Sequence, residues 1–352
     1  IHSGLYYKPG SLKAQNCVNG RKMMYQFCDE QSIKYEKCGK IVIASGENEI
    51  PALDELHMRG TANGLQGIRR IRKEEIKEYE PHASGIEGLY VPETGIVDYK
   101  QVTEKYADII QKSGGEIKKN TRFISLSKEG NRFILNTTSG DIRCKFIVNC
   151  GGLQSDRIAK ICGVEPKLQI VPFRGEYYKL KKEKEYLVNN LIYPVPDPKF
   201  PFLGVHFTRI INGGVEAGPN AVLAFKREGY LLNDFSFKDI AEMLNFRGFW
   251  KMAAKYYKMG FTEYHRSFSK AAFVKALQKL IPGIKYDDVY REGSGVRAQA
   301  LESNGKLVDD FRIIEAERMV HVLNAPSPAA TASLSIGKII AGKVFQRFDN
   351  SI

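Results

Sequence analysis

The run Phe146-Ile147-Val148-Asn149-Cys150 is apolar and stops at Gly151-Gly152, and Ser155-Asp156 follows shortly after. An apolar run of this length is typical of a buried parallel strand, and Ser-Asp can begin a helix. Two glycines between a strand and a helix allow the backbone to approach a ligand closely, although an ordinary tight turn has the same pattern. This order of strand, turn and helix favours a mixed α/β protein.

The sequence on both sides of this run alternates between helical and strand-like patterns. We expect helices over residues 12–30, 47–62, 99–112, 237–258 and 329–347. We expect strands over residues 40–44, 121–126, 132–136, 170–180, 203–208, 215–217 and 319–323. From residue 170 onward, a period of two indicates an antiparallel sheet with one apolar face.

The composition excludes several classes of protein. The chain has 352 residues, of which 43% are hydrophobic, and 53 Lys and Arg against 40 Asp and Glu give a net charge of +13. A mostly disordered chain is excluded, and no run of about 18 apolar residues could form a transmembrane helix. The length favours two domains of roughly 150 residues each. The dispersed basic residues argue against nucleic acid and leave a solvated basic surface or an anionic small-molecule site.

Most short motifs in the sequence lack the surrounding elements that their usual function requires. The six cysteines form no C-x-x-C pair and are interpreted as free thiols, and no histidine pair at metal spacing predicts a metal site. Gly293-Ser294-Gly295-Val296-Arg297-Ala298 matches G-x-G-x-x-A, but the charged stretch 286–292 before it does not read as a buried strand, so we reject a dinucleotide site there. The rigid loop 324–328 before the last helix presents backbone N–H groups that suit an anion or a carbonyl.

Eight segments carry a resemblance to a known family. They are His2–Pro9, Thr94–Tyr99, Ile170–Glu176, Ile192–Asp197, Phe200–Thr208, Gly218–Ala221, Gly295–Gln299 and Asn324–Thr331. Together and in this order they resemble the L-2-hydroxyglutarate dehydrogenase family, which are flavoproteins of the D-amino-acid-oxidase-like superfamily. The resemblance extends from residue 1 nearly to the end of the chain.

The resemblance implies an α/β fold in which a Rossmann-like FAD-binding domain is interleaved with an antiparallel-sheet substrate domain. The expected FAD-binding domain comprises residues 1–36, 96–165 and 290–352, and the expected substrate domain comprises residues 37–95 and 166–289. Such a family opens with a strand, G-x-G-x-x-G and a helix, whereas this sequence starts after that unit. We therefore expect an N-terminally incomplete FAD domain that binds the pyrophosphate poorly.

The implied reaction is the FAD-dependent oxidation of L-2-hydroxyglutarate to 2-oxoglutarate, with a hydride passing from C2 to the flavin. For the substrate carboxylates we predict Arg174 and Arg297, because a guanidinium pairs bidentately with a carboxylate. Lys226 and Arg227 are weaker candidates for the distal carboxylate. For catalysis we predict His206 as the base and His2 as its partner near the flavin or substrate. Tyr7 is a further candidate donor to the substrate.

The resemblance also implies which residues contact FAD. These are Ser3, Gly4, Phe123, Gly151, Gly152, Asn324, Ala325, Ser327, Pro328, Ala329 and Ala330. Phe123 occupies a position where related enzymes usually carry valine. The loop from Asn324 is expected to face the flavin ring.

The partners implied are a small dicarboxylate and an electron acceptor, either a membrane quinone or an electron-transfer protein. A mitochondrial, inner-membrane-associated protein is expected, and the basic helix around Trp250 could lie on a membrane surface. Two alternatives stay open. One is an amine or amino-acid oxidase of the same fold, and the other is a truncated chain without FAD and without activity.

Overall fold

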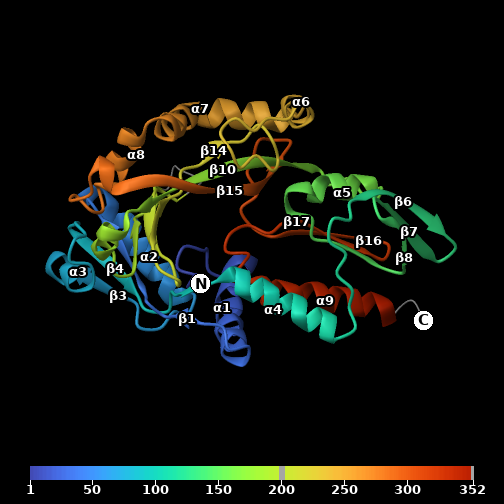
Figure 1. The fold of residues 1–352 in the computed structure, drawn as a ribbon, viewed down its shortest axis with the longest axis horizontal. Coiled ribbons are helices and arrows are strands. Elements are labelled where there is room, and N and C mark those ends of the chain that lie inside the picture. Colours follow the sequence, from blue (N-terminus) through green and yellow to red (C-terminus); the bar gives the residue numbers. More distant parts are fainter. Residues whose placement is uncertain (198–202, 350–352) are drawn as a thin grey trace.

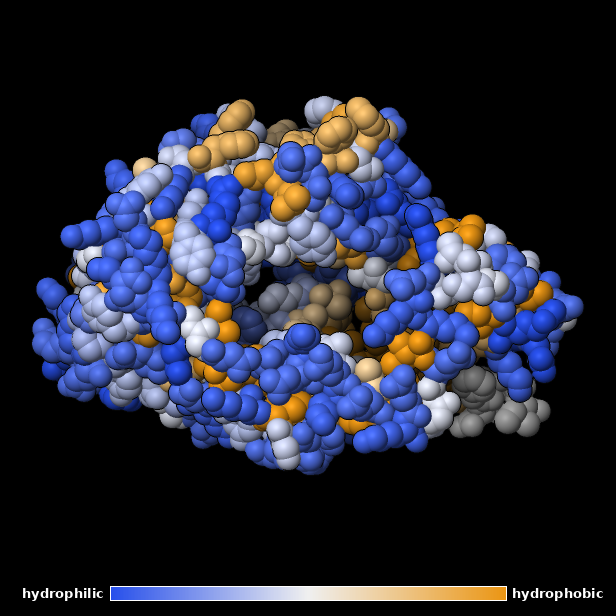
Figure 2. Space-filling view, in the orientation of Figure 1, coloured by the Kyte–Doolittle hydropathy of each residue, from blue (hydrophilic) through white to orange (hydrophobic). Residues whose placement is uncertain are grey.

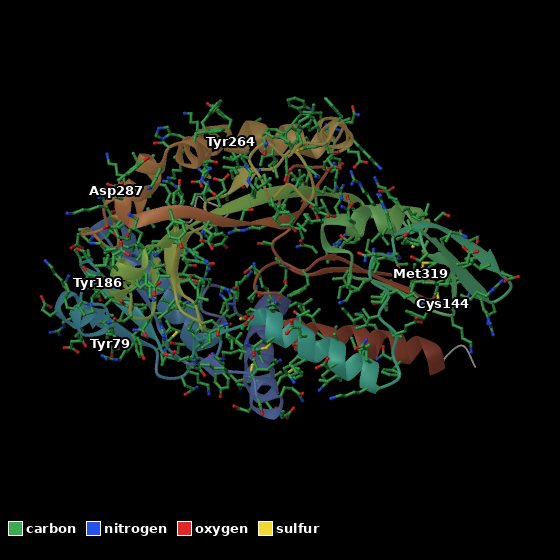
Figure 3. The ribbon with its side chains drawn as sticks, viewed as in Figure 1. Tyr79, Cys144, Tyr186, Tyr264, Asp287 and Met319 are labelled. Carbon is green, nitrogen blue, oxygen red and sulfur yellow. The ribbon has the colours of Figure 1, made fainter. Side chains whose placement is uncertain are left out.

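The computed structural model describes residues 1–197 and 203–349. The Phe200–Phe202 part of the segment quoted above and the last three residues of the expected FAD domain lie outside the described residues. Figure 1 shows a large curved sheet on one side, smaller sheets on the other, and helices below and above the space between them. Figure 3 labels residues at the two ends of the molecule. Tyr79 and Tyr186 lie at the large sheet, and Cys144 and Met319 lie at the small sheets.

The large sheet has nine strands. Its strands follow the order β14 (Val222–Leu223), β10 (Leu168–Leu180), β13 (Val215–Gly218), β12 (His206–Arg209), β11 (Leu191–Pro194), β2 (Lys40–Ala44), β4 (Glu87–Val91) and β3 (Arg69–Arg72), and β15 (Val289–Glu302) pairs with β10. All neighbours run antiparallel except β11 and β2. The antiparallel sheet expected after residue 170 is confirmed.

One face of this sheet is the main core. Ile41, Ile192 and Phe207 pack there against Phe273 and Leu277 of α8 (Lys270–Leu277). Because side chains alternate along a strand, the residues between them point to the opposite face, toward the rest of the molecule.

The other end of the molecule contains two three-stranded sheets. They consist of β16 (Arg312–Ala316), β17 (Met319–Asn324) and β9 (Ile147–Asn149), and of β6 (Phe123–Glu129), β7 (Arg132–Thr137) and β8 (Gly140–Cys144). β9 runs parallel to β17, and α5 (Ser155–Ile161) follows the two glycines. The strand, turn and helix predicted from residues 146–156 are confirmed, although Val148 is 43% exposed, so only one face of the strand is buried.

The remaining elements are mostly helices. They are α1 (Leu12–Glu30), α2 (Ile50–Ala62), α3 (Lys73–Tyr79), α4 (Tyr99–Lys112), α6 (Phe237–Leu244), α7 (Arg247–Phe268) and α9 (Ser333–Asp349), with the two-stranded pair β1 (Tyr35–Glu36) and β5 (Ile96–Val97). Ser11 and Asp98 cap α1 and α4 as expected. Gly20 of α1 lies against the chain before α9, where a Cβ would come within 2.5 Å of Ala332 Cα. This close approach fixes the turn at residues 329–332.

Two sequence expectations were wrong in detail. The helix expected over 237–258 is two helices, because Phe246 adopts an extended backbone and packs with Phe249 and Met252. The last helix begins at Ser333 instead of 329, after turns closed by Ala332 N–H to Pro328 O. The expectation that the charged residues before Gly293 are not a buried strand is confirmed, since residues 290–292 are an exposed part of the edge strand β15. β15 joins the large sheet, although residues 290–302 were assigned to the FAD domain.

Candidate active site

A cavity of about 1510 Å³ occupies the centre of the molecule. It opens as the hollow in the middle of Figure 2. The parts of the chain that line it include the inner face of the large sheet, the N-terminal segment, the loop before α9, and the helices α7 and α9. The residues that bear on function are His2, Tyr6, Tyr7, Gly152, Tyr177, Tyr193, His206, Thr208, Glu216, Lys251, Lys255, Tyr256, Arg297, Ala325, Ser327 and Ala329.

Strand register explains why the sheet contributes so many polar groups. His206 is paired with Gly218, and Thr208 is paired with both Glu216 and Leu191. Residues opposite each other on neighbouring strands point to the same face, as do residues two apart on one strand. His206, Thr208, Glu216 and Tyr193 therefore share the face that looks into the cavity.

His206 is held in a single orientation. Its ring stacks on Tyr193 with centroids 4.0 Å apart, and its Nδ1 lies 2.9 Å from the carbonyl oxygen of Gly204. Because a carbonyl only accepts hydrogen bonds, Nδ1 carries the proton and donates it, which leaves Nε2 as the lone-pair nitrogen of the neutral ring. Burial lowers the pKa of His206 to about 4, with the charges of Arg297 and Lys40 adding to the effect. The imidazole is thus a neutral base at physiological pH.

Arg297 lines the cavity, but Arg174 does not. In the pairing of β10 with β15, Arg297 is opposite Phe173 and Arg174 is opposite Val296, so the two side chains point to opposite faces. Arg174 is 3% exposed and donates to Glu176 Oε1 at 3.0 Å and to the Leu231 carbonyl at 2.9 Å. The structure thus corrects the expectation that both arginines meet the substrate: Arg174 is committed to a buried ion pair. Burial lowers the pKa of Arg297, while Tyr177 and Glu263 oppose that shift.

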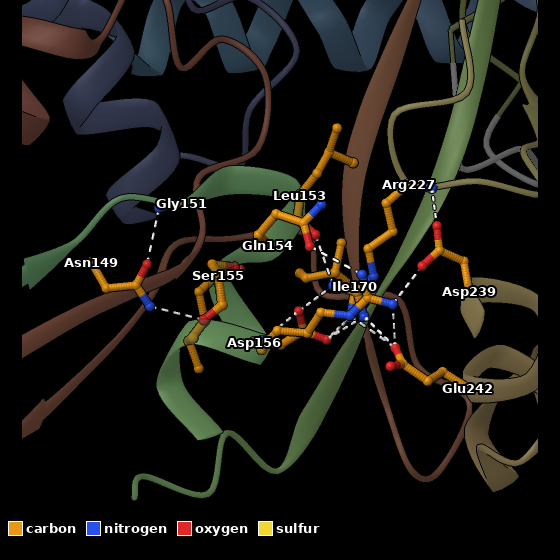
Figure 4. Close-up of polar contacts among 12 residues, drawn as sticks. Asn149, Gly151, Leu153, Gln154, Ser155, Asp156, Ile170, Arg227, Asp239 and Glu242 are labelled. Atoms are coloured by element: carbon orange, nitrogen blue, oxygen red, sulfur yellow. Dashed lines mark hydrogen bonds and ion pairs between the residues drawn. The ribbon is translucent and has the colours of Figure 1, made fainter. Parts of the chain in front are cut away.

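Arg227, the weaker candidate for the distal carboxylate, is also committed elsewhere. Figure 4 shows its guanidinium between Asp156 and Glu242. It is 3% exposed, donates to both carboxylate oxygens of Asp156 and donates to the Leu153 carbonyl at 2.7 Å. This buried network ties the chain before α6 to α5. Lys226 does not line the cavity either.

The N-terminal segment brings three aromatic groups to the cavity. Burial holds the pKa of His2 well below its usual value, and the positive charges of the chain terminus and Lys40 act in the same direction. The His2 N–H donates to Thr331 Oγ1 at 3.1 Å. Tyr7 lines the cavity, and so does Tyr6, whose buried hydroxyl has no partner among the described residues. Ser3 and Gly4 are buried behind this surface.

The side of the cavity opposite the sheet fits a large flat cofactor. The lining residues Ser333, Ile336, Gly337 and Ile340 follow helical spacing, so one face of α9 borders the cavity. Nothing lies within 4 Å of where a Cβ of Gly337 or Gly152 would be. Ala325, Ser327 and Ala329 complete this wall, and Pro328 and Ala330 line a neighbouring cavity. Such open, small-residue walls suit a ring system, and FAD fits the groups present.

Besides Ser3 and Gly4, three more predicted cofactor residues do not line either cavity. Asn324 is 3% exposed and donates to the carbonyl oxygens of Val308 and Asp310, so it supports the loop and does not line it. Gly151 lies beside the cavity-lining Gly152, and its N–H donates to Asn149 Oδ1 at 3.0 Å. Phe123 belongs to β6 in the outer three-stranded sheet and borders neither cavity.

Sequence reasoning missed several polar residues of the site. Tyr193, Thr208 and Glu216 lie on three neighbouring strands, and only strand alternation combined with the pairing partners could have placed them together. Lys255 and Tyr256 enter from α7 on the far side. Their helix was recognised, but its inner face could not be distinguished from its outer one, because both are aromatic.

Comparison with known proteins places the chain among flavoproteins. The family described as FAD dependent oxidoreductase matches residues 1–343. The chain is 52% identical over 349 residues to the L-2-hydroxyglutarate dehydrogenase of Indibacter alkaliphilus, covering 99% of this chain and 88% of that protein. It is 46% identical over 367 residues to the mitochondrial L-2-hydroxyglutarate dehydrogenase of Homo sapiens, covering 99% and 79%.

The fold has solved counterparts. The FAD-bound, dithionite-reduced L-α-glycerophosphate oxidase of Mycoplasma pneumoniae superimposes with a TM-score of 0.76 over 95% of this chain and 80% of that one, at 20% sequence identity. At this identity the likeness concerns the fold alone.

Proposed function

Since the chain belongs to the FAD-dependent oxidoreductase family, we propose that it oxidises L-2-hydroxyglutarate to 2-oxoglutarate with FAD as its cofactor. One observation carries the proposal: Arg297 and His206 face the same cavity as the loop residues Ala325 and Ser327. Oxidation of a 2-hydroxy acid needs a carboxylate-binding cation and a base beside the cofactor, and this arrangement supplies both.

The roles of the residues follow from their geometry. Oxidation at C2 removes a hydride from carbon and a proton from the hydroxyl oxygen. His206 Nε2 accepts the hydroxyl proton, because Nδ1 is already committed to the Gly204 carbonyl. Arg297 binds a substrate carboxylate and fixes the orientation of C2. The chemistry that FAD supplies when bound is acceptance of the hydride with its electron pair. Gly152, the loop 325–330 and the inner face of α9 would hold FAD.

A turnover assay tests this function. We expect the full chain, incubated with FAD, to reduce an artificial electron-accepting dye when L-2-hydroxyglutarate is added. The D enantiomer should give no reduction above background, because with its carboxylate at Arg297 its C2 hydroxyl does not point at His206. Glycine, sarcosine and proline should give none either, because they lack the C2 hydroxyl from which His206 takes the proton. Equal reduction with the D enantiomer, or turnover of the amino acids alone, would contradict the assignment. The second of these results would identify an amino-acid oxidase.

We further propose that α7 docks on an anionic membrane, at the mitochondrial inner membrane where the electron acceptor resides. The outward side of α7 carries Trp250, Tyr257, Phe261 and Phe268, which are 57%, 55%, 73% and 74% exposed. Spacings of 7, 11 and 18 residues from Trp250 place all four on one side of the helix. Figure 2 shows apolar residues gathered over this top edge. No helix in the described parts of the chain is long and apolar enough to cross a bilayer.

The four exposed aromatic residues of α7 form an apolar stripe, and the lysines beside this stripe favour binding to a lipid surface. Lys251, Lys255 and Lys258 lie on the same helix, and Lys251 and Lys255 also border the cavity. A helix with aromatic residues flanked by lysines binds anionic lipid through apolar burial and charge together. Since α7 borders the cavity through Lys251, Lys255 and Tyr256, a membrane acceptor would meet the protein at the edge of the active-site cavity. The mitochondrial name of the human relative supports this location.

Vesicle binding tests the membrane proposal. We expect the F261S/F268S double variant to bind vesicles containing phosphatidylglycerol about tenfold more weakly, because two exposed rings no longer insert. Flotation measures the bound fraction. The control is F345S, since Phe345 on α9 is 68% exposed but lies outside the stripe. Equal loss in F345S, or full binding by the double variant, would exclude α7 as the docking surface.

A further inference from the structure

Building on the proposed oxidation of a hydroxy dicarboxylate, we propose that Lys40 is a second anion-binding group of the site. It holds one carboxylate of the substrate, while Arg297 binds the other. Lys40 would then determine that the enzyme accepts dicarboxylates and discriminates against monocarboxylates.

Lys40 is buried, and none of the residues that the structure describes gives it an anionic partner. It lies on β2, inside the large sheet, and is 1% exposed. Its Nζ lies 4.3 Å from the ring centroid of Tyr6 and 5.1 Å from that of Tyr193, and no carboxylate among the described residues pairs with it. Buried lysines are otherwise almost always paired, because an unpaired charge in a protein interior is costly. A ligand carboxylate would provide the missing charge.

Lys40 borders a second cavity that adjoins the first. This cavity has a volume of about 550 Å³. The two cavities share His2, Tyr193, Thr208, Glu216, Ser327 and Ala329 in their linings. Thr94 lines the second cavity, and its buried hydroxyl has no partner among the described residues, as is also true of the Tyr6 hydroxyl. Buried polar groups are rarely left unpaired, and both hydroxyls can donate to a carboxylate oxygen.

The sheet places the two cations on either side of the base. From β15, which carries Arg297, the strand order runs through β12, which carries His206, to β2, which carries Lys40. His206 and Lys40 both contact the ring of Tyr193. A substrate with its reacting carbon at His206 therefore has a cation available in each direction along the sheet, which matches a molecule with a carboxylate at each end.

The protonation state of Lys40 should depend on whether an anion is bound beside it. Burial lowers the pKa of Lys40 to about 7, and Cys17 opposes the shift. The other titratable groups around it are Tyr6, His2 and the terminal amine of Ile1 from the N-terminal segment, Tyr193 from β11, and His206 from β12. The protonated lysine binds an anion, so dicarboxylate affinity should fall as the pH rises above about 7.

Equilibrium binding of two non-oxidisable probes tests the proposal. Glutarate carries two carboxylates, and pentanoate has the same chain length with one. We expect K40M, titrated as the full chain with FAD, to lose about 10- to 100-fold in glutarate affinity and less than about twofold in pentanoate affinity. K40R should retain most of the glutarate affinity, because it keeps the charge. The control is K37M, since Lys37 lies 4.5 Å over the Tyr25 ring but at the surface.

The outcomes separate this proposal from the function itself. Unchanged glutarate affinity in K40M would overturn the role of Lys40 while leaving the enzyme assignment intact. A wild-type chain that binds neither probe would instead count against the proposed function. Should K40M fail to fold, the wild type decides: its glutarate affinity must weaken between pH 6 and pH 8 around the pKa of about 7 while its pentanoate affinity stays level. A pH-independent preference for glutarate would contradict the proposal.

Discussion

Replacing Arg297 with methionine should reduce kcat/KM for L-2-hydroxyglutarate by about 100- to 1000-fold. Truncating one member of a buried, hydrogen-bonded charge pair typically costs 2–5 kcal/mol. In R297M the group left without a partner is the substrate carboxylate, and without the guanidinium C2 is no longer aligned with His206. R297K should recover only part of the loss, because an ammonium group cannot form the two parallel hydrogen bonds of a guanidinium. Steady-state kinetics with the dye acceptor provide the measurement.

Arg174 supplies the matched control for this prediction. Its ion pair with Glu176 is buried, with side chains 4% and 5% exposed. Removing one partner of such a pair destabilises a protein by about 3–5 kcal/mol. R174M should therefore lower the Tm while the folded protein keeps the wild-type KM. If R174M raises KM as much as R297M does, the division of roles between the two arginines is wrong.

The contrast between these arginines shows what the sequence could and could not predict. Both residues lie in segments that resemble the same family, and both are arginines on strands. Only the pairing of Arg297 with Phe173 and of Arg174 with Val296 separates the two faces. Register between strands far apart in the chain depends on tertiary packing, so periodicity along one strand cannot specify it.

The burial of Lys40 likewise could not be predicted from the sequence. The strand around it was recognised from its apolar residues, and the structure confirms its bounds at Lys40–Ala44. A lysine at the start of an apolar strand is usually at the surface, so the local pattern did not predict its burial. Its burial results from Tyr6 and Tyr193, which lie 34 residues before and 153 residues after it in the chain. Local patterns therefore located most elements, whereas the polar groups of the site depend on long-range contacts.

Replacing His206 with asparagine should reduce kcat by about 100- to 10,000-fold with little change in KM, which is the range for loss of a general base. In the wild type, the neutral ring is the active form. kcat/KM should therefore be level at neutral pH and fall as the pH drops through the pKa of about 4. A bound dianion favours the imidazolium, so the acid limb of kcat should lie at a higher pH than that of kcat/KM.

The pH profile distinguishes a base from a residue that only shapes the cavity. In H206N, kcat should drop and the fall of the rate at acid pH should disappear. A packing defect would instead lower the rate at every pH and leave the fall at acid pH in place. H57N serves as the control, because His57 lies on α2 away from both cavities and should keep the wild-type profile. H2N should raise KM more than it lowers kcat, since His2 borders both cavities. If H2N instead abolishes the acid limb and H206N retains it, the base is His2.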